Sequence, residues 1–162
     1  MFQLNDLIIY GNNGVCRVEE ISTPRFPNSP PDRLYYSLTP INKKGVIYVP
    51  VDSKMFMRPI ITAEEVQALL QELPDLPAVP YYNGTVQLLI AHYEEVFKGY
   101  SCRDLLLIIR SIFAKRAEVE AQGRHLGQVD QRYLKRAQEL LYSEIAAALG
   151  ISVAEVPALI EQ

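Results

Sequence analysis

Short apolar runs alternate with turns over the first sixty residues of the chain. Five runs have the length and the β-branched or aromatic content of strands, and they cover residues 7–10, 15–19, 34–38, 46–50 and 56–60. The segments 11–14 (GNNG) and 42–45 (NKKG) have compositions typical of tight turns. Residues 22–32 contain four prolines and no sustained period, which predicts a loop. Pro50 lacks an N–H and therefore indicates a strand end or an edge.

The hydrophobic period changes after residue 61. Thr62-Ala63-Glu64-Glu65 is a capping-box sequence, and the apolar residues that follow it are spaced as on a helix. Pro74, Pro77 and Pro80 end this helix and predict a stiff linker. Further helices are predicted over residues 86–98, 101–121 and 129–149, with Gly99 and Gly150 as stops, and a short one follows the Ser152-x-x-Glu155 box.

These patterns predict an α+β chain with two small modules. Several short strands joined by Gly/Asn turns favour a small SH3-like or Tudor-like β-barrel, followed by an all-α C-terminal helical domain. We expect the barrel over residues 1–61, a helix and Pro-rich linker over 62–84, and the helical domain over 85–162. A chain of 162 residues, about half of them hydrophobic, is long enough to pack both.

Basic residues are concentrated in the helical half, although the whole chain carries a net charge of −3. Residues 98–136 hold nine basic and four acidic residues, a local charge of +5. Arg132, Lys135 and Arg136 share one helix face by their spacing. Arg103, Arg110 and Arg124 extend this face if the helices pack side by side. The patch fits contact with a phosphate backbone without base reading, and equally a solvated face with counter-charges.

The pattern of chemically reactive residues predicts no enzyme. The two histidines, His92 and His125, belong to no HExxH motif, and neither GxSxG nor a Gly-rich phosphate loop is present. Cys16 and Cys102 form no CxxC pair, so we expect no metal site, no cofactor and no disulfide framework. The longest apolar run, 105–109, is far below the ~20 residues that span a bilayer. A cytoplasmic protein without membrane contact is therefore expected.

The order of the motifs resembles the CarD-like family of transcription regulators. The opening FQLNDLIIYGNNGV (residues 2–15) is similar to the family's F-x-x-G-D-x-V-V-Y strand and the turn after it. Residues 46–52 resemble the family's V-P strand, and residues 57–61 its exit into the first helix. Residues 91–99 and 134–146 resemble two helices of its C-terminal half. The resemblance covers nearly the whole chain in order.

This resemblance implies a Tudor-like module, shared with the transcription-repair coupling factor, that binds the β subunit of RNA polymerase. The binding mode would add a strand to an exposed sheet edge, with residues 34–38 and 46–50 as candidate strands. The polymerase-binding residues expected from it are Arg25, Tyr35, Tyr36, Tyr48, Val49 and Pro50. Family members often carry an arginine where this chain has Tyr48.

The helical half would contact upstream promoter DNA, stabilise the open complex and hold the protein at the nucleoid through polymerase. The DNA-contacting residues expected are Tyr82, Thr85, Arg103, Arg110, Arg124, Arg132, Lys135 and Arg136. Well-known members insert a tryptophan into the minor groove at the start of the second helix, and Thr85 aligns there. Tyr81 or Tyr82 lies nearby as a bulky substitute.

Two alternatives remain open from the residues. The chain could be an adaptor that binds polymerase or another partner without DNA. It could also be an unrecognised enzyme that uses Cys102 or His125, which would require a concave pocket around them.

Overall fold

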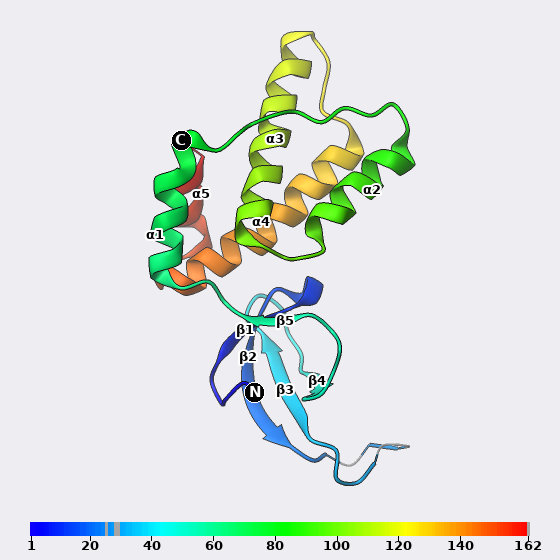
Figure 1. Ribbon diagram of the computed structural model, residues 1–162, viewed down its shortest axis with the longest axis vertical. Coiled ribbons are helices and arrows are strands. Elements are labelled where there is room, and N and C mark those ends of the chain that lie inside the picture. Colours follow the sequence, from blue (N-terminus) through cyan, green and yellow to red (C-terminus); the bar gives the residue numbers. More distant parts are fainter. Residues whose placement is uncertain (25, 28–29, 162) are drawn as a thin grey trace. The chain divides into compact units, whose positions relative to one another are not determined.

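The computed structural model describes residues 1–24, 26–27 and 30–161. The chain divides into two compact units, residues 1–60 and residues 61–162. The first is a sheet and the second is helical, which gives the predicted α+β class. Figure 1 shows the elements of both units in sequence colours.

The N-terminal unit is a five-stranded antiparallel sheet with the order β4-β3-β2-β1-β5. The strands are β1 (Leu7–Tyr10), β2 (Val15–Ser22), β3 (Tyr35–Pro40), β4 (Ile47–Pro50) and β5 (Met57–Pro59). Among the described residues β4 and β5 do not pair with each other, so the sheet is open where the sequence predicted a closed barrel. The second strand reaches Ser22 instead of ending at 19, because its outer half pairs with β3 across a register shift between Val18 and Glu20.

One face of the sheet forms the core of this unit. The fully buried side chains there include Ile8, Cys16, Val18, Tyr36, Leu38 and Val49. The hydroxyl of Tyr36 accepts the N–H of Phe2 at 3.1 Å, which ties the start of the chain to the core. The predicted turn at 11–14 forms a short 3-10 helix, η1 (Gly11–Asn13), and both of its glycines have positive φ, 47° and 70°.

The described part of the second unit, residues 61–161, contains five α-helices and two short 3-10 helices. They are α1 (Ala63–Glu72), η2 (Leu73–Asp75), α2 (Val86–Phe97), α3 (Cys102–Ala121), α4 (Gln128–Leu149), η3 (Val153–Glu155) and α5 (Val156–Ile160). Both predicted capping boxes are present, at Thr62/Glu65 and Ser152/Glu155. The predicted glycine stop after α2 is confirmed, because Gly99 directly follows the C-cap residue Lys98, and the positive φ in this turn falls on Tyr100 (48°).

The Pro-rich segment lies against α3. We call residues 76–84 the strap. Arg110 donates to the Leu76 carbonyl at 3.2 Å, and Ser111 donates to the Val79 carbonyl at 2.6 Å. Figure 1 shows this segment crossing α3 on its way from α1 to α2. The strap therefore belongs to the packed helical unit, since two hydrogen bonds fix its backbone.

A buried ion pair joins the three long helices. Lys115 of α3 and Asp130 of α4 lie 2.9 Å apart, with side chains only 8% and 5% exposed. The hydroxyl of Tyr93, on α2, donates to the other oxygen of Asp130. The ammonium of Lys115 also lies 4.9 Å from the ring centre of Tyr82 in the strap. One carboxylate thus holds α2, α3 and α4 together and, through Lys115, contacts the strap.

A second buried carboxylate fixes the start of the helical unit. Glu144 of α4 is 1% exposed and accepts the N–H of Ile61 at 2.7 Å. Residue 61 directly precedes the cap of α1, so this bond ties the start of the first helix to α4.

Replacing Lys115 with Met should destabilise the helical unit by about 3–5 kcal/mol, because Asp130 would then be a buried charge without its cation. The double variant Lys115→Met/Asp130→Asn should recover part of this loss, since asparagine carries no charge and still accepts the Tyr93 hydroxyl. Urea unfolding followed by far-UV circular dichroism measures both. As a control, Glu95→Gln removes the exposed Lys98–Glu95 pair and should leave the midpoint unchanged. A double variant no more stable than Lys115→Met would contradict this view of the pair.

Candidate functional site: a sheet edge and a helical face

The free edge of β4 is the first candidate site. β4 pairs only with β3 in the sheet order, with Tyr36 opposite Val49 and Ser37 opposite Tyr48. Val51 donates to the Leu34 carbonyl at 3.0 Å, and hydrogen-bonded positions alternate along an antiparallel pair. Residues 47, 49 and 51 therefore direct their backbone groups toward β3. The N–H and C=O of Tyr48 point away from the sheet, as does the ring nitrogen of Pro50, which has no proton to donate.

Aromatic side chains cover the outer face beside this edge. The Tyr48 side chain is 50% exposed. Phe26 lies 5.2 Å, centre to centre, from both Tyr48 and Tyr35, in edge-to-face contacts. Arg33 lies over the Tyr35 ring at 5.8 Å and pairs with Asp52 at 3.5 Å. The edge thus combines an outward backbone donor and acceptor with an aromatic, partly charged surface.

The six polymerase-binding residues expected from the sequence do not all lie on this surface. Tyr35, Tyr48 and Pro50 lie at the edge or on its outer face. Tyr36 and Val49 are each only 2% exposed, so their side chains face the core. Arg25 lies outside the described residues. Sequence reasoning did not single out Phe26, although an aromatic residue inside a polar, Pro-rich loop was a usable signal.

Several of the predicted DNA-binding cations already have partners within the helical unit. Arg103 pairs with Glu72 at 3.3 Å, and Arg110 bonds the strap. Arg136 contacts Glu94 at 3.0 Å and lies 4.4 Å from the ring centre of Phe97. Both contacts hold α2 against α4.

The acceptor of Arg136 is shared with a tyrosine. The Tyr133 hydroxyl donates to Glu94 at 2.6 Å. This hydrogen bond lowers the pKa of Glu94, and the Arg136 cation acts in the same direction. Glu94 therefore stays ionised and neutralises one charge of the predicted basic face.

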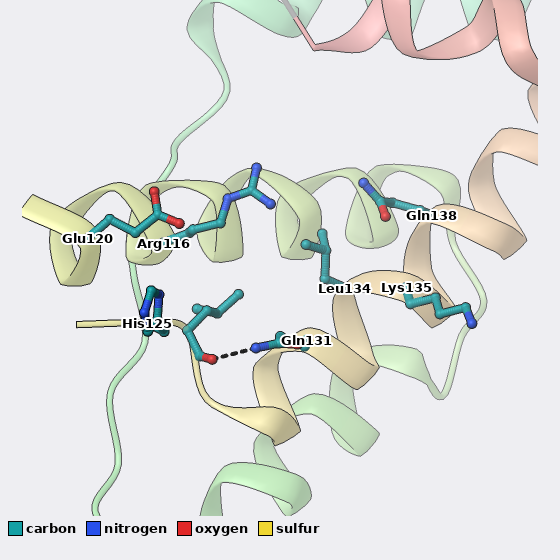
Figure 2. Close-up of a pocket in the computed structure, with 8 residues that line it drawn as sticks. Arg116, Glu120, His125, Gln131, Leu134, Lys135 and Gln138 are labelled. Atoms are coloured by element: carbon teal, nitrogen blue, oxygen red, sulfur yellow. Dashed lines mark hydrogen bonds between the residues drawn. The ribbon is translucent and has the colours of Figure 1, made fainter. Parts of the chain in front are cut away.

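The remaining predicted cations lie on more open positions. Arg124 bonds the neighbouring Gln122, and Arg132 stacks over Tyr133 at 5.1 Å. Lys135 is exposed and helps to line a hollow of about 250 Å³ between the end of α3, the loop after it and α4. Figure 2 shows His125 and Lys135 at opposite ends of this hollow, with Arg116 and Glu120 along α3. Because these charged groups do not converge, the hollow does not form a focused anion site.

The segment before α2 carries the two other predicted DNA-contacting residues. Tyr82 is 49% exposed, and its hydroxyl donates to Glu118, which raises the pKa of the tyrosine. Thr85 is the N-cap residue of α2, but its side chain caps no backbone N–H. Instead its own N–H donates to the Asn83 side chain at 2.9 Å. Val86 and Leu88, which follow, are more than half exposed.

In the described ranges, no group of three His, Cys, Asp or Glu side chains is arranged to hold a metal ion. Cys16 and Cys102 are both buried, and no disulfide links them. His125 is exposed and is one of the residues that line the hollow in Figure 2.

Across the described part of the chain, no single helix has the length and apolar character needed to cross a membrane. α4 and residues 153–160, bent by 104°, meet that test only when taken together.

Comparison with known families decides the nature of the first unit. Residues 2–61 match the family described as CarD-like/TRCF RID domain. The N-terminal unit is a CarD-like RID domain. The match ends where the sheet unit ends, and no curated protein matches the chain. The RID family consists of protein-interaction domains of RNA polymerase-interacting transcription factors, not of catalytic domains.

The Cys16 thiol should be nearly inert in the folded protein. Burial raises its pKa to about 11, so roughly 0.1% is thiolate at pH 8. In a Cys102→Ser variant, which leaves Cys16 as the one thiol, iodoacetamide at pH 8 should react about a hundredfold more slowly than in the same variant unfolded by urea. Mass spectrometry of timed samples measures the rates. Equal rates would show that this part of the sheet opens readily.

Proposed function

We propose that this chain is a non-enzymatic bacterial transcription regulator that docks on the β subunit of RNA polymerase through its CarD-like RID domain. The family match over residues 2–61 carries the proposal. The free edge of β4 supports it, because strand addition needs outward backbone groups on an exposed strand. The Tudor-like description of the sheet and a cytoplasmic, nucleoid-associated location are parts of the same proposal.

In this proposal the partner strand lies along β4 and bonds the outward N–H and C=O of Tyr48. Tyr35, Tyr48 and Phe26 give the partner an aromatic surface beside the new strand. The aromatic groups contribute area and a polar tip, which suits an interface. Tyr36 and Val49 act indirectly by holding β4 in place from the core side.

The helical unit then contacts promoter DNA without reading its sequence and stabilises the open complex. Arg124, Arg132 and Lys135 are the best placed for phosphate contact, because they are exposed and form no ion pair among the described side chains. Arg103 and Arg136 are engaged with Glu72 and Glu94. Thr85 aligns with the position of the family's tryptophan, and Tyr82 is a bulky residue close to it in the sequence.

A second function is an adaptor that binds polymerase without DNA. The internal pairing of Arg103 and Arg136, with Arg110 bound to the strap, favours it by reducing the free basic surface. Open-complex lifetime on a promoter, measured with and without the protein and with polymerase from the same cell, separates the two. A lengthened lifetime supports the DNA-contacting regulator, and an unchanged lifetime with intact polymerase binding supports the adaptor.

Tyr48→Pro should weaken polymerase binding about fivefold to tenfold more than Tyr48→Ala does. Both variants lose the aromatic ring, but only proline removes the outward N–H, and one such hydrogen bond is worth about 1 kcal/mol. Biolayer interferometry with immobilised polymerase measures the two affinities, and circular dichroism verifies that both variants fold.

Met57→Pro is the matched control on the opposite edge. Ile60 donates to the Leu7 carbonyl, so the N–H of Met57 faces away from β1 just as that of Tyr48 faces away from β3. This variant should bind polymerase like the wild type. Equal affinities for Tyr48→Pro and Tyr48→Ala would exclude strand addition at β4, and a selective loss in Met57→Pro would move the site to β5.

Arg132→Gln and Lys135→Gln should each lower the salt dependence of binding to forked promoter DNA by about one unit in the slope of log K against log salt. The physical reason is that each phosphate contact releases about one counterion. Fluorescence anisotropy over a salt series measures the slope. Arg103→Gln, whose side chain pairs with Glu72, is the control and should leave the slope unchanged. Wild-type protein without measurable DNA affinity would leave the adaptor as the function.

A further inference from the structure

A second hollow lies beneath the strap, apart from the β4 edge and the basic face. It has a volume of about 290 Å³ and lies between the strap, α2 and α3. Its lining is mainly apolar, with His92, Asp104 and Ser111 as the polar members. The residues are Pro77, Val79, His92, Tyr93, Val96, Asp104, Leu107, Ile108 and Ser111. This volume is close to the lower end of the range for small-molecule sites.

The hollow has a defined length because one stripe of α3 forms its floor. Asp104, Leu107, Ile108 and Ser111 are spaced i, i+3, i+4 and i+7, so they share one helix face. Seven residues at 1.5 Å each separate Asp104 from Ser111 by roughly 10 Å along the helix. Pro77 and Val79 of the strap form another wall, and the bonds of the strap to Arg110 and Ser111 hold that wall in position.

Asp104 determines the charge of the lining. Asp104 is the acidic member, and no ion pair or hydrogen bond of its carboxylate occurs among the described residues. Its backbone N–H bonds Ser101, so the residue is fixed in the first turn of α3. Burial, and then the cation of Lys115, lower the pKa of His92, so this imidazole is neutral at pH 7. The hollow therefore presents one negative charge at the end of an apolar channel.

We propose that this hollow binds a small organic amine, with its ammonium group on Asp104 and an apolar body along Leu107 and Ile108. The carboxylate complements the cation, and the apolar walls exclude water from the body of the ligand. A body of about 10 Å fits the distance to Ser111. This site goes beyond polymerase and DNA recognition, because none of its lining residues lies on the surfaces assigned to them.

The first hollow provides an internal comparison. Its lining holds the two cations of Arg116 and Lys135 beside the one carboxylate of Glu120, so it disfavours an amine (Figure 2). The two hollows lie on different parts of α3, and a ligand that is selective for one should distinguish them by charge alone.

Three probes with the same apolar body test the proposal on the 162-residue chain: 4-phenylbutylamine, 4-phenylbutanol and 4-phenylbutyrate. Two-dimensional NMR titration should show the amine shifting signals of residues 92–96 and 104–111 with a Kd of about 1 mM, which is expected for a ligand of this size. The amine should bind about fivefold more tightly than the alcohol, since a partly exposed ion pair contributes modestly. The carboxylate should bind more weakly than the alcohol.

Asp104→Asn should remove the preference for the amine over the alcohol while leaving the affinity for the alcohol intact. Glu120→Gln, an exposed carboxylate at the other hollow on the same helix, is the matched control and should keep the fivefold preference. Leu107→Trp should fill the hollow and abolish shifts from all three probes, with the melting temperature verifying the fold. Shifts confined to other surfaces, or an amine preference that persists in Asp104→Asn, would overturn the proposal.

Discussion

The carboxylate of Asp130 is the interaction on which the helical unit depends. It receives the ammonium of Lys115 from α3 and the hydroxyl of Tyr93 from α2, and all three groups are almost completely buried. A buried carboxylate is costly unless its partners satisfy it, so this cluster favours a packing of the three helices that brings Lys115 and Tyr93 to Asp130. The same burial and hydrogen bond raise the pKa of Tyr93, which keeps its hydroxyl protonated and available as the donor. We expect such a cluster to contribute specificity of packing more than net stability, because the attraction within a buried ion pair is offset by the cost of removing its charges from water.

Contacts with this cluster, with α3 and with α2 hold the strap in position. Lys115 contacts the Tyr82 ring, Glu118 accepts its hydroxyl, and Tyr81 stacks on His92 at 3.6 Å. On its own, a Pro-rich segment would be an extended spacer. These contacts pack it against the helical unit instead. The residues at the start of α2 are presented from this fixed base, so any partner of Tyr82 or Val86 meets a preorganised surface instead of a mobile one.

Local signals made much of the fold predictable. The capping boxes at Thr62 and Ser152 involve residues within one helical turn of each other, so the sequence alone predicts them. The turn at 11–14 is equally local, because its glycines readily adopt the positive φ that it needs. Pro50 likewise indicated an edge before the strand order was known. The open sheet was not predictable, because closure depends on how distant strands meet.

The distribution of charge was less predictable than the helices that carry it. Glu94 and Arg136 are 42 residues apart, and Glu72 and Arg103 are 31 apart. The pairing of these residues depends on how the helices cross, which no spacing rule predicts, and so a local charge of +5 overstated the free basic surface.

Each edge strand of the sheet ends in a proline whose nitrogen faces away from the neighbouring strand, Pro50 on β4 and Pro59 on β5. Within the strand residues an incoming backbone finds one amide donor per edge and then a proline. Each edge therefore offers a partner strand only one amide donor, and copies of the protein stacked edge to edge into a fibril would find no continuous row of donors.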